Sequence, residues 1–408
     1  MTLFRHDSIK ITGGRLLLLL LLLLCWSLPA LAEDQTEGQN PVHSNEYELH
    51  LFSILEDIRS GQVNRARQRL EIMLEQNPRF KLAQLVYGDL LRARVSALGS
   101  VGAVGGKVTL QQQALRDEMV KRWQHLSRHE RAEIPSYLLD LDASYKHVIV
   151  VDTADSRLYL YRNDGGWLKL VNDYYISIGL AGANKFSQGD KRTPIGVYFV
   201  NEFIPPEQLP DLYGAGAFPI NYPNEWDQHL GKTGNGIWLH GTPSYTFNRP
   251  PQASDGCVTL SNYDFNHLSS FVDVGNTPVI IADGIEWGDR DSIEKQRQAF
   301  YSLLEQWRED WESHNIERFL SNYSIEFNSQ GKNFEAWAEN ARLAYADAGK
   351  IRIRLSNVSV FAYPDQDLLV TTFRQEYQSD NTRLDLFKRQ YWKQDAQGRW
   401  KIVYEGSV

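Results

Sequence analysis

The hydrophobic pattern changes twice along the 408-residue chain, and these changes limit the folds that it can adopt. From about Tyr47 to Leu139 apolar residues recur at helical spacing, and from about Ser144 to Asp283 short β-rich runs replace them. Beyond Ile293 an amphipathic helical pattern precedes further strand-like runs. One ordinary domain holds about 100–200 residues, so we predict a multidomain protein. The predicted parts are an α-helical region over residues 45–140, a mainly β domain over 144–283 and an α+β domain over 292–408.

The N-terminus has the pattern of an export signal. Basic residues precede a run of nine leucines, Leu16–Leu24, and the small residues Ala30 and Ala32 follow it. This order is typical of a secretory signal peptide over residues 1–32, cleaved after Ala32. The apolar run is shorter than the ~20 residues of a membrane span. An uncleaved membrane anchor is the alternative.

The charge of the chain excludes two classes of partner. The formal net charge is −8, and the first 32 residues carry a net +2, so the remainder carries about −10. Binding to nucleic acid and to an anionic membrane surface both depend on a basic protein surface. We therefore expect neither partner.

The helical region contains one recognisable unit. The segment "GQVNRARQRLEIMLEQNPRFKLAQLVYGDLLRAR" has helical spacing on both sides of a break at Asn77-Pro78. It resembles one tetratricopeptide-type helical hairpin. A stable array needs about three such units, so a helical cap on the following domain is the alternative. The glycine-rich stretch from Ala97 to Lys107 predicts a flexible loop.

Cleavage of the leader would leave one cysteine. Cys25 lies next to the leucine run, and Cys257 lies in "SDGCVTLSN". A lone cysteine in an exported chain indicates an intermolecular disulfide or a reactive thiol. A small buried hydrophobic residue is the third alternative.

The neighbours of Cys257 favour the reactive thiol. His240 ends the apolar run "IWLHG" 17 residues earlier, where a catalytic base could lie. Gly256 allows a sharp turn, and the amides of Gly256 and Cys257 could face a developing oxyanion. The Ser261-x-x-Asp264 spacing predicts a helix N-terminus just after the thiol.

The residues "HGTPSYTFNRPPQASDGCVTLSN" and "TPIGVY" resemble the active-site signature of the YkuD-type L,D-transpeptidases, over about Lys146 to Ala282. The resemblance implies a β-rich catalytic domain in the periplasm or cell envelope that acts on peptidoglycan stem peptides. Such enzymes attack the bond between the diamino acid and the following D-Ala, release D-Ala, and pass the thioester to an amine. By position, Cys257 would be the nucleophile, His240 the base, Gly256 an oxyanion-hole amide and Ser254 a supporting hydroxyl.

Two positions depart from the family pattern. Asp255 stands where His is frequent, and its charge would raise the pKa of the thiol unless it points elsewhere. Thr259 stands where the family often has an Arg after the cysteine and its hydrophobic neighbour. Without that Arg, the expected hold on a carboxylate is weaker. Water could then compete with the amine, or Arg192 or Arg249 could hold the carboxylate instead.

The expected substrate contacts come from the same resemblance and from the long segment Ile204–Gly236, which we expect to be a lid over the substrate groove. The expected substrate-binding residues are Gly241, Arg192, Tyr222, Trp226 and Lys232. The pattern contains no metal-ligand spacing, and we expect no metal and no cofactor.

Two further resemblances concern specificity and the C-terminal domain. "AFPINYPNEWDQHLGKTGNGIWLHG" resembles the YafK-like branch, in which water can be the acceptor and a protein linked to the cell wall can be the partner. The region after Ile293 is similar to SnoaL-like, nuclear-transport-factor-like rolls, and it implies an accessory domain or a contact with a second copy of the chain. A hydrolase of the same family and a non-catalytic envelope scaffold are the alternative functions.

Overall fold

The structure is a computed structural model that describes residues 44–93, 109–127, 133–329 and 331–407. The predicted leader, with Cys25, and the glycine-rich stretch 97–107 lie outside these ranges. The described residues belong to one compact unit, Val42–Val408. Within these ranges, every helix is too short or too polar to span a lipid bilayer.

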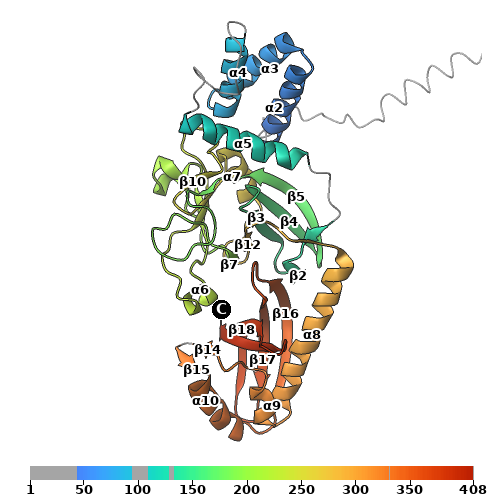
Figure 1. The fold of residues 1–408 in the computed structure, drawn as a ribbon. Helices are drawn as coiled ribbons and strands as arrows, with labels where there is room; N and C mark the ends of the chain where they lie inside the picture. Colours follow the sequence, from blue (N-terminus) through green and yellow to red (C-terminus); the bar gives the residue numbers. More distant parts are fainter. Residues whose placement is uncertain (1–43, 94–108, 128–132, 330, 408) are drawn as a thin grey trace, which may run out of the picture. The chain divides into compact units, whose positions relative to one another are not determined.

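The N-terminal region is helical, as predicted, but its helices end earlier than expected (Figure 1). α3 ends directly before the predicted break at Asn77, whose N–H donates to Met73 O (2.8 Å). Leu51, Leu70 and Phe80 are among the side chains that form its buried core. The helices are α2 (Ser44–Arg59), α3 (Val63–Gln76), α4 (Lys81–Ala93) and α5 (Leu110–Leu126).

The end of the predicted helical region, residues 134–140, forms strands instead. β1 (Ile134–Pro135) pairs with β13 (Trp287–Gly288), and β2 (Leu138–Asp140) pairs antiparallel with a strand of the C-terminal sheet. The apolar run "YLLDL" fits helix and strand equally well, and pairing with a distant sheet edge decides in favour of strand.

The central domain contains a five-stranded sheet in the order β5-β4-β3-β12-β7. β3, β4 and β5 form the predicted antiparallel meander, whereas β12 runs parallel to β3 and antiparallel to β7. The strands are β3 (His147–Asp152), β4 (Arg157–Asp164), β5 (Trp167–Tyr175), β7 (Gly196–Phe199) and β12 (Pro278–Ala282).

This sheet is buried on both faces, and for that reason its inner strands lack a polar side. Ile149 and Val151 point into a core shared with α7 (Asn262–Ser269) and the small sheet that carries the site. Val148 and Val150 point into a second core that is shared with the C-terminal domain. The run "VIVV" therefore joins two domains.

A second, three-stranded sheet, in the order β11-β9-β8, positions the sequence motifs of the site. β8 (Ala217–Pro219) runs antiparallel to β9 (Trp238–His240), and β11 (Val258–Thr259) runs parallel to β9. Between β9 and β11 in the chain, β10 (Gln252–Ser254) forms a short parallel pair with β6 (Ile178–Gly179).

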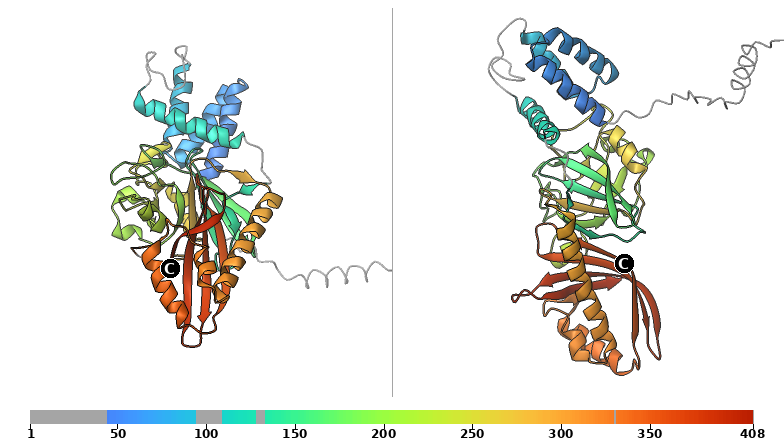
Figure 2. Two further views of the ribbon diagram at one scale, coloured as in Figure 1. Left: turned by 60° about the horizontal axis from the view of Figure 1, so that its bottom comes forward. Right: turned by 90° about the vertical axis from the view of Figure 1, so that its right-hand side faces the viewer.

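The C-terminal domain is a helix-covered antiparallel sheet in the order β19-β18-β17-β16-β2. The long helix α8 lies along this sheet in both views of Figure 2, and Phe300 and Trp307 are buried in its core there. Its elements are α8 (Arg290–Glu312), α9 (Ile316–Leu320), β14 (Asn328–Ser329), β15 (Lys332–Asn333), α10 (Phe334–Ala346), β16 (Arg352–Ala362), β17 (Leu368–Gln378), β18 (Arg383–Gln394) and β19 (Trp400–Ser407).

The opposite face of the C-terminal sheet packs on the catalytic domain. Phe361, Val370 and Tyr391 share a core with the central sheet. The short helix α6 (Glu225–His229) adds a polar contact, because Arg389 Nη1 donates to Glu225 Oε1 (2.8 Å). A second copy of the chain would have to use another surface of this domain.

We expect Glu225→Ala to lower the free energy of unfolding by about 1–3 kcal/mol. Arg389 is buried, and the variant leaves its charge without this carboxylate. The partial exposure of Glu225 keeps the figure below that of a fully buried pair. Urea unfolding followed by tryptophan fluorescence measures the change. Glu305→Ala, which breaks an exposed contact with Arg308 within α8, should cost less than about 0.5 kcal/mol. Equal losses in the two variants would contradict the interpretation.

Candidate active site

Parallel pairing of β9 with β11 brings the two predicted catalytic segments together. The register places His240 opposite Thr259 and Leu239 opposite Val258. Cys257 directly precedes β11, so its backbone lies next to the strand that pairs with His240. The fold thus brings the segment after the thiol and the strand that ends at His240 side by side.

Hydrogen bonds fix the orientation and tautomer of His240, which is buried. Its Nδ1 lies 2.7 Å from Gly241 O, and a carbonyl oxygen only accepts, so Nδ1 carries the proton. Nε2 is then an acceptor and lies 3.4 Å from Thr259 Oγ1, which donates to it. An imidazole in this tautomer can take a proton from a thiol at Nε2.

Close packing behind His240 explains the glycine at position 241. A Cβ there would lie 2.2 Å from Asn262 Oδ1 and 2.7 Å from Ala215 N. Asn262, at the start of α7, accepts from the N–H groups of Ala215 (2.9 Å) and Thr242 (3.0 Å) and donates to Thr242 O (2.8 Å). Gly241, which we expected to bind substrate, therefore has an observed role in holding the imidazole.

The loop that carries Cys257 is held by Ser254. Its Oγ donates to Cys257 O (2.6 Å) and accepts from Gly256 N (3.1 Å). We expected the Gly256 amide to face an oxyanion, but in the structure its single N–H donates to Ser254 instead. The helix predicted after the thiol is present as α7, with Ser261 as its N-cap, accepting from Asp264 N (3.1 Å).

Thr193 holds the same loop from the other side. Its Oγ1 donates to Gly256 O (2.9 Å) and accepts from Gly179 N (3.0 Å). Gly256 has φ +127°, and a Cβ there would lie 2.7 Å from Arg192 O. The motif "TPIGVY" predicted no role for Thr193. That role depends on a contact between segments distant in the chain, which the motif does not contain.

Burial shifts both reactive groups toward their neutral forms. It lowers the pKa of His240 to about 4 and raises the pKa of Cys257 to about 11. The Cys257 thiol donates to Gly236 O (3.4 Å). At neutral pH the site therefore holds a thiol and a neutral imidazole, which must remove the proton as the thiol attacks.

The two departures from the family pattern have structural explanations. Asp255 points into solvent, with Oδ1 3.8 Å from Lys191 Nζ, and its charge adds to the burial that raises the pKa of Cys257. Thr259 is buried against His240, so an Arg at this position would not fit without displacing the core. Thr259 is thus a site residue in its own right.

Three of the five expected substrate contacts are structural, and the predicted lid is packed. Tyr222 lies in the central core, and Trp226 Nε1 donates to Gln366 Oε1 (3.0 Å) of the C-terminal domain. Lys232 Nζ forms a buried ion pair with Asp227 Oδ1 (2.8 Å). The segment Ile204–Gly236 includes β8 and α6, and it packs because its aromatic side chains fill two cores. Arg192 stays exposed beside the cysteine loop, and its Nη1 donates to Ala183 O (2.8 Å).

One aromatic residue of this segment does reach the site. The Tyr213 ring lies edge-on to His240 (5.0 Å between centroids) and packs on Trp238 (4.8 Å). It belongs to the short 3₁₀ helix η2 (Asp211–Tyr213). The sequence around it, rich in glycine, gave no signal that distinguished it from the other aromatic residues.

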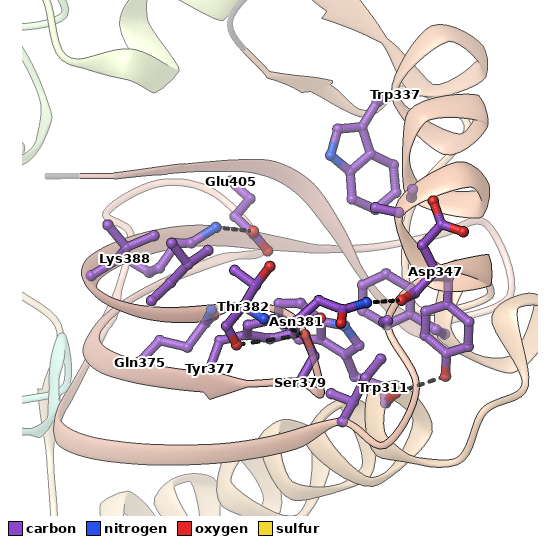
Figure 3. A pocket seen from close by; sticks show the side chains of 18 residues that line it. Trp311, Trp337, Asp347, Gln375, Tyr377, Ser379, Asn381, Thr382, Lys388 and Glu405 are labelled. Atoms are coloured by element: carbon purple, nitrogen blue, oxygen red, sulfur yellow. Dashed lines mark hydrogen bonds and ion pairs between the residues drawn. The ribbon is translucent and has the colours of Figure 1, made fainter.

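A hollow of about 500 Å³ lies in the C-terminal domain (Figure 3). Trp311, Trp337 and Tyr377 line it, so not all aromatic residues of this domain fill its core as expected. Figure 3 also shows the ion pair between Lys388 and Glu405. Lys388 Nζ lies 2.6 Å from Glu405 Oε1. Burial alone would raise the pKa of Glu405, but the ion pair with Lys388 and the hydrogen bonds from Gln390 and Tyr323 together lower it. Within the described ranges, no three His, Cys, Asp or Glu side chains gather as a metal-binding group.

Comparison with known families agrees with this geometry. Residues 146–281 match the family model of the L,D-transpeptidase catalytic domain (YkuD), and residues 299–406 match that of the Cds6 C-terminal NTF2-like domain. The chain therefore carries a YkuD-type L,D-transpeptidase domain, of a family that acts on peptidoglycan stem peptides, followed by an NTF2-like domain. Both assignments confirm the sequence prediction. A comparison with curated proteins gave no match.

Two solved structures resemble the chain over more than its catalytic domain. Bd1075 of Bdellovibrio bacteriovorus is 28% identical with a TM-score of 0.60, and the match covers 68% of this chain and 98% of that one. The helical cell shape determining protein Pgp2 from Campylobacter jejuni is 25% identical with a TM-score of 0.57, over 67% of this chain and 95% of that one.

We expect alkylation of Cys257 by iodoacetamide to increase up to a midpoint near pH 11, because the thiolate is the reactive form. Acylation by a carbapenem should instead be level from about pH 5 to 9. Lowering the pH toward 4 protonates His240 and should reduce it. Stopped-flow or mass-spectrometric rates across pH 3–11 measure both profiles. An alkylation midpoint below pH 8 would show a resting ion pair and contradict this site.

We expect Gly241→Ala to slow acylation of Cys257 by about 10–100-fold while the protein stays folded. The added methyl group displaces Asn262 or the Gly241 backbone, and His240 loses its fixed orientation. Gly88→Ala, where a Cβ meets open space in α4, is the matched control. Carbapenem labelling rates and circular dichroism check both variants, and an unchanged Gly241→Ala rate would refute the role.

Proposed function

We propose that the chain is an exported cysteine L,D-transpeptidase that acts on peptidoglycan stem peptides in cell-wall cross-linking or remodelling. The observation that supports this most directly is the juxtaposition of the Cys257 segment with a neutral His240 whose Nε2 can accept a proton. A non-catalytic scaffold would not need a buried imidazole held in this tautomer. Export is proposed from the N-terminal pattern.

The proposed reaction has two halves. The thiol of Cys257 leaves Gly236 O and attacks the carbonyl carbon of the diamino acid, while its proton passes to Nε2 of His240. His240 then returns the proton to the departing nitrogen of D-Ala, and a thioester remains. An amine attacks this thioester, His240 takes its proton, and the thiol is restored. The Cys257 amide remains a candidate donor to the oxyanion.

Hydrolysis is the second candidate function, because the position after the cysteine and its apolar neighbour is a buried Thr259 instead of an Arg. The site then lacks one cation expected to hold a carboxylated partner, and water could attack the thioester. The similarity to Pgp2, a helical cell shape determining protein, supports a role for either reaction in setting cell shape.

We expect purified protein to convert stem tetrapeptides, and Cys257→Ala and His240→Ala to abolish or strongly reduce conversion. Loss of the base should cost about 10²–10⁴-fold. Mass spectrometry of peptidoglycan fragments separates cross-linked peptide, released D-Ala and a freed tripeptide without cross-link. Cross-links support transpeptidation, tripeptide alone supports hydrolysis, and turnover by folded Cys257→Ala would refute cysteine chemistry.

A further inference from the structure

The N-terminal helices hold one segment of the catalytic domain, residues 244–251, at several points. The Phe247 side chain is buried in the helical core, with its ring 5.1 Å from that of Phe80 and 5.4 Å from that of Tyr47. The main chain is held as well, since Phe247 N donates to Arg79 O (3.4 Å) and Arg79 Nη1 donates to Ser244 O. We call residues 244–251 the clamped segment.

A buried charge network connects α2 and α5 to the same segment. Arg122 of α5 pairs with Glu118 Oε1 (3.0 Å) and Glu48 Oε2 (3.4 Å), and its guanidinium lies 3.8 Å from the centroid of the Tyr175 ring. With the side-chain amide of Asn248 turned to satisfy both of its ends, Arg122 Nη2 also donates to Asn248 oxygen (2.6 Å). The helices thereby hold Asn248, the residue directly before Arg249.

Hydrogen bonds connect the backbone around Arg249 to the strand beside His240. Tyr175 Oη donates to Arg249 O (3.2 Å), and Ser177 Oγ donates to Pro250 O. The Ser177 N–H also donates to Thr259 O (2.9 Å). A single residue, Ser177, thus connects the clamped segment to the strand that contacts His240.

The side chain of Arg249 is available to a ligand. It is partly buried, and among the described residues it forms no ion pair, whereas Arg192 bonds to a carbonyl and Lys185 is paired with Asp190 (2.8 Å). Burial has the larger effect on both reactive groups: it raises the pKa of Cys257 and lowers that of His240. The positive charge of Arg249 lowers both pKa values, so Arg249 lies within electrostatic reach of both groups.

We infer that Arg249 binds the terminal carboxylate of the stem peptide next to the scissile bond, and that the N-terminal helices position it through the clamped segment. This inference rests on the proposed function, in which the departing D-Ala carries that carboxylate. It also makes the helices part of the active-site structure instead of a separate binding module.

The test uses the full chain with Cys25→Ser, which leaves Cys257 as the only thiol. Kinetics are measured on a stem tetrapeptide with a free C-terminal carboxylate and on the same peptide amidated. Arg249→Gln should raise KM for the carboxylate peptide by about 10–100-fold, as expected for a lost charge-assisted bond. KM for the amidated peptide should stay within about threefold, and Arg249→Lys should restore part of the selectivity.

The role of the helices is tested with Phe247→Ala against Leu70→Ala, which removes a buried side chain from the helical core on α3. Phe247→Ala should reproduce the loss of carboxylate selectivity, and Leu70→Ala should keep it even if both are destabilised. The same selectivity in Phe247→Ala as in Leu70→Ala would overturn the positioning role. Unchanged selectivity in Arg249→Gln, with wild type active, would overturn the recognition role and leave the proposed function standing.

A second measurement is independent of peptidoglycan turnover. The pH midpoint for alkylation of Cys257 by iodoacetamide should move upward in Arg249→Gln and in Phe247→Ala, because a cation near the thiolate is lost or displaced. It should not move in Leu70→Ala. If wild type converts neither peptide, the proposed function fails. A shifted midpoint in Arg249→Gln would then still place Arg249 near the thiol, and an unshifted one would not.

Discussion

Burial of the central sheet on both faces is the constraint on which the other parts of the structure depend. One face, with Ile149 and Val151, supports the small sheet and α7, and these carry His240 and the cysteine loop. The other face, with Val148 and Val150, packs on the C-terminal sheet. Apolar area removed from water is worth roughly 25 cal/mol per Å², so neither neighbour can be detached without exposing a face of the sheet.

This arrangement connects both flanking regions to the catalytic domain. The C-terminal domain covers the sheet and is connected through α6, where Glu225 pairs with Arg389. The N-terminal helices contact a different part of the catalytic domain, the clamped segment, through Phe247 and the Arg122 network. The three regions differ in their sequence patterns, yet they form one compact unit.

The reactive groups are tuned by burial more than by charge. Both His240 and Cys257 are shifted toward neutral forms, and the carbonyl of Gly241 determines which imidazole nitrogen is unprotonated. Such a site holds little thiolate at neutral pH, which slows oxidation and alkylation of Cys257. Its reactivity depends instead on proton removal at the moment of attack, which requires well-fixed geometry. The tight contacts at Gly241 and Gly256 supply that geometry.

The sequence by itself determined the fold class and the helix cap at Ser261, and it predicted the pair Cys257 and His240, because each rests on local spacing or on a short motif. It could not assign Tyr222, Trp226 and Lys232, since an aromatic or basic residue in a long segment looks the same whether it meets substrate or core. Tertiary structure decided these three, and it also gave Thr193, Thr259 and Asn262 their roles through hydrogen bonds between segments far apart in the chain. The strand at residues 138–140 was decided in the same way, because pairing with β16 is a long-range contact that no local pattern contains.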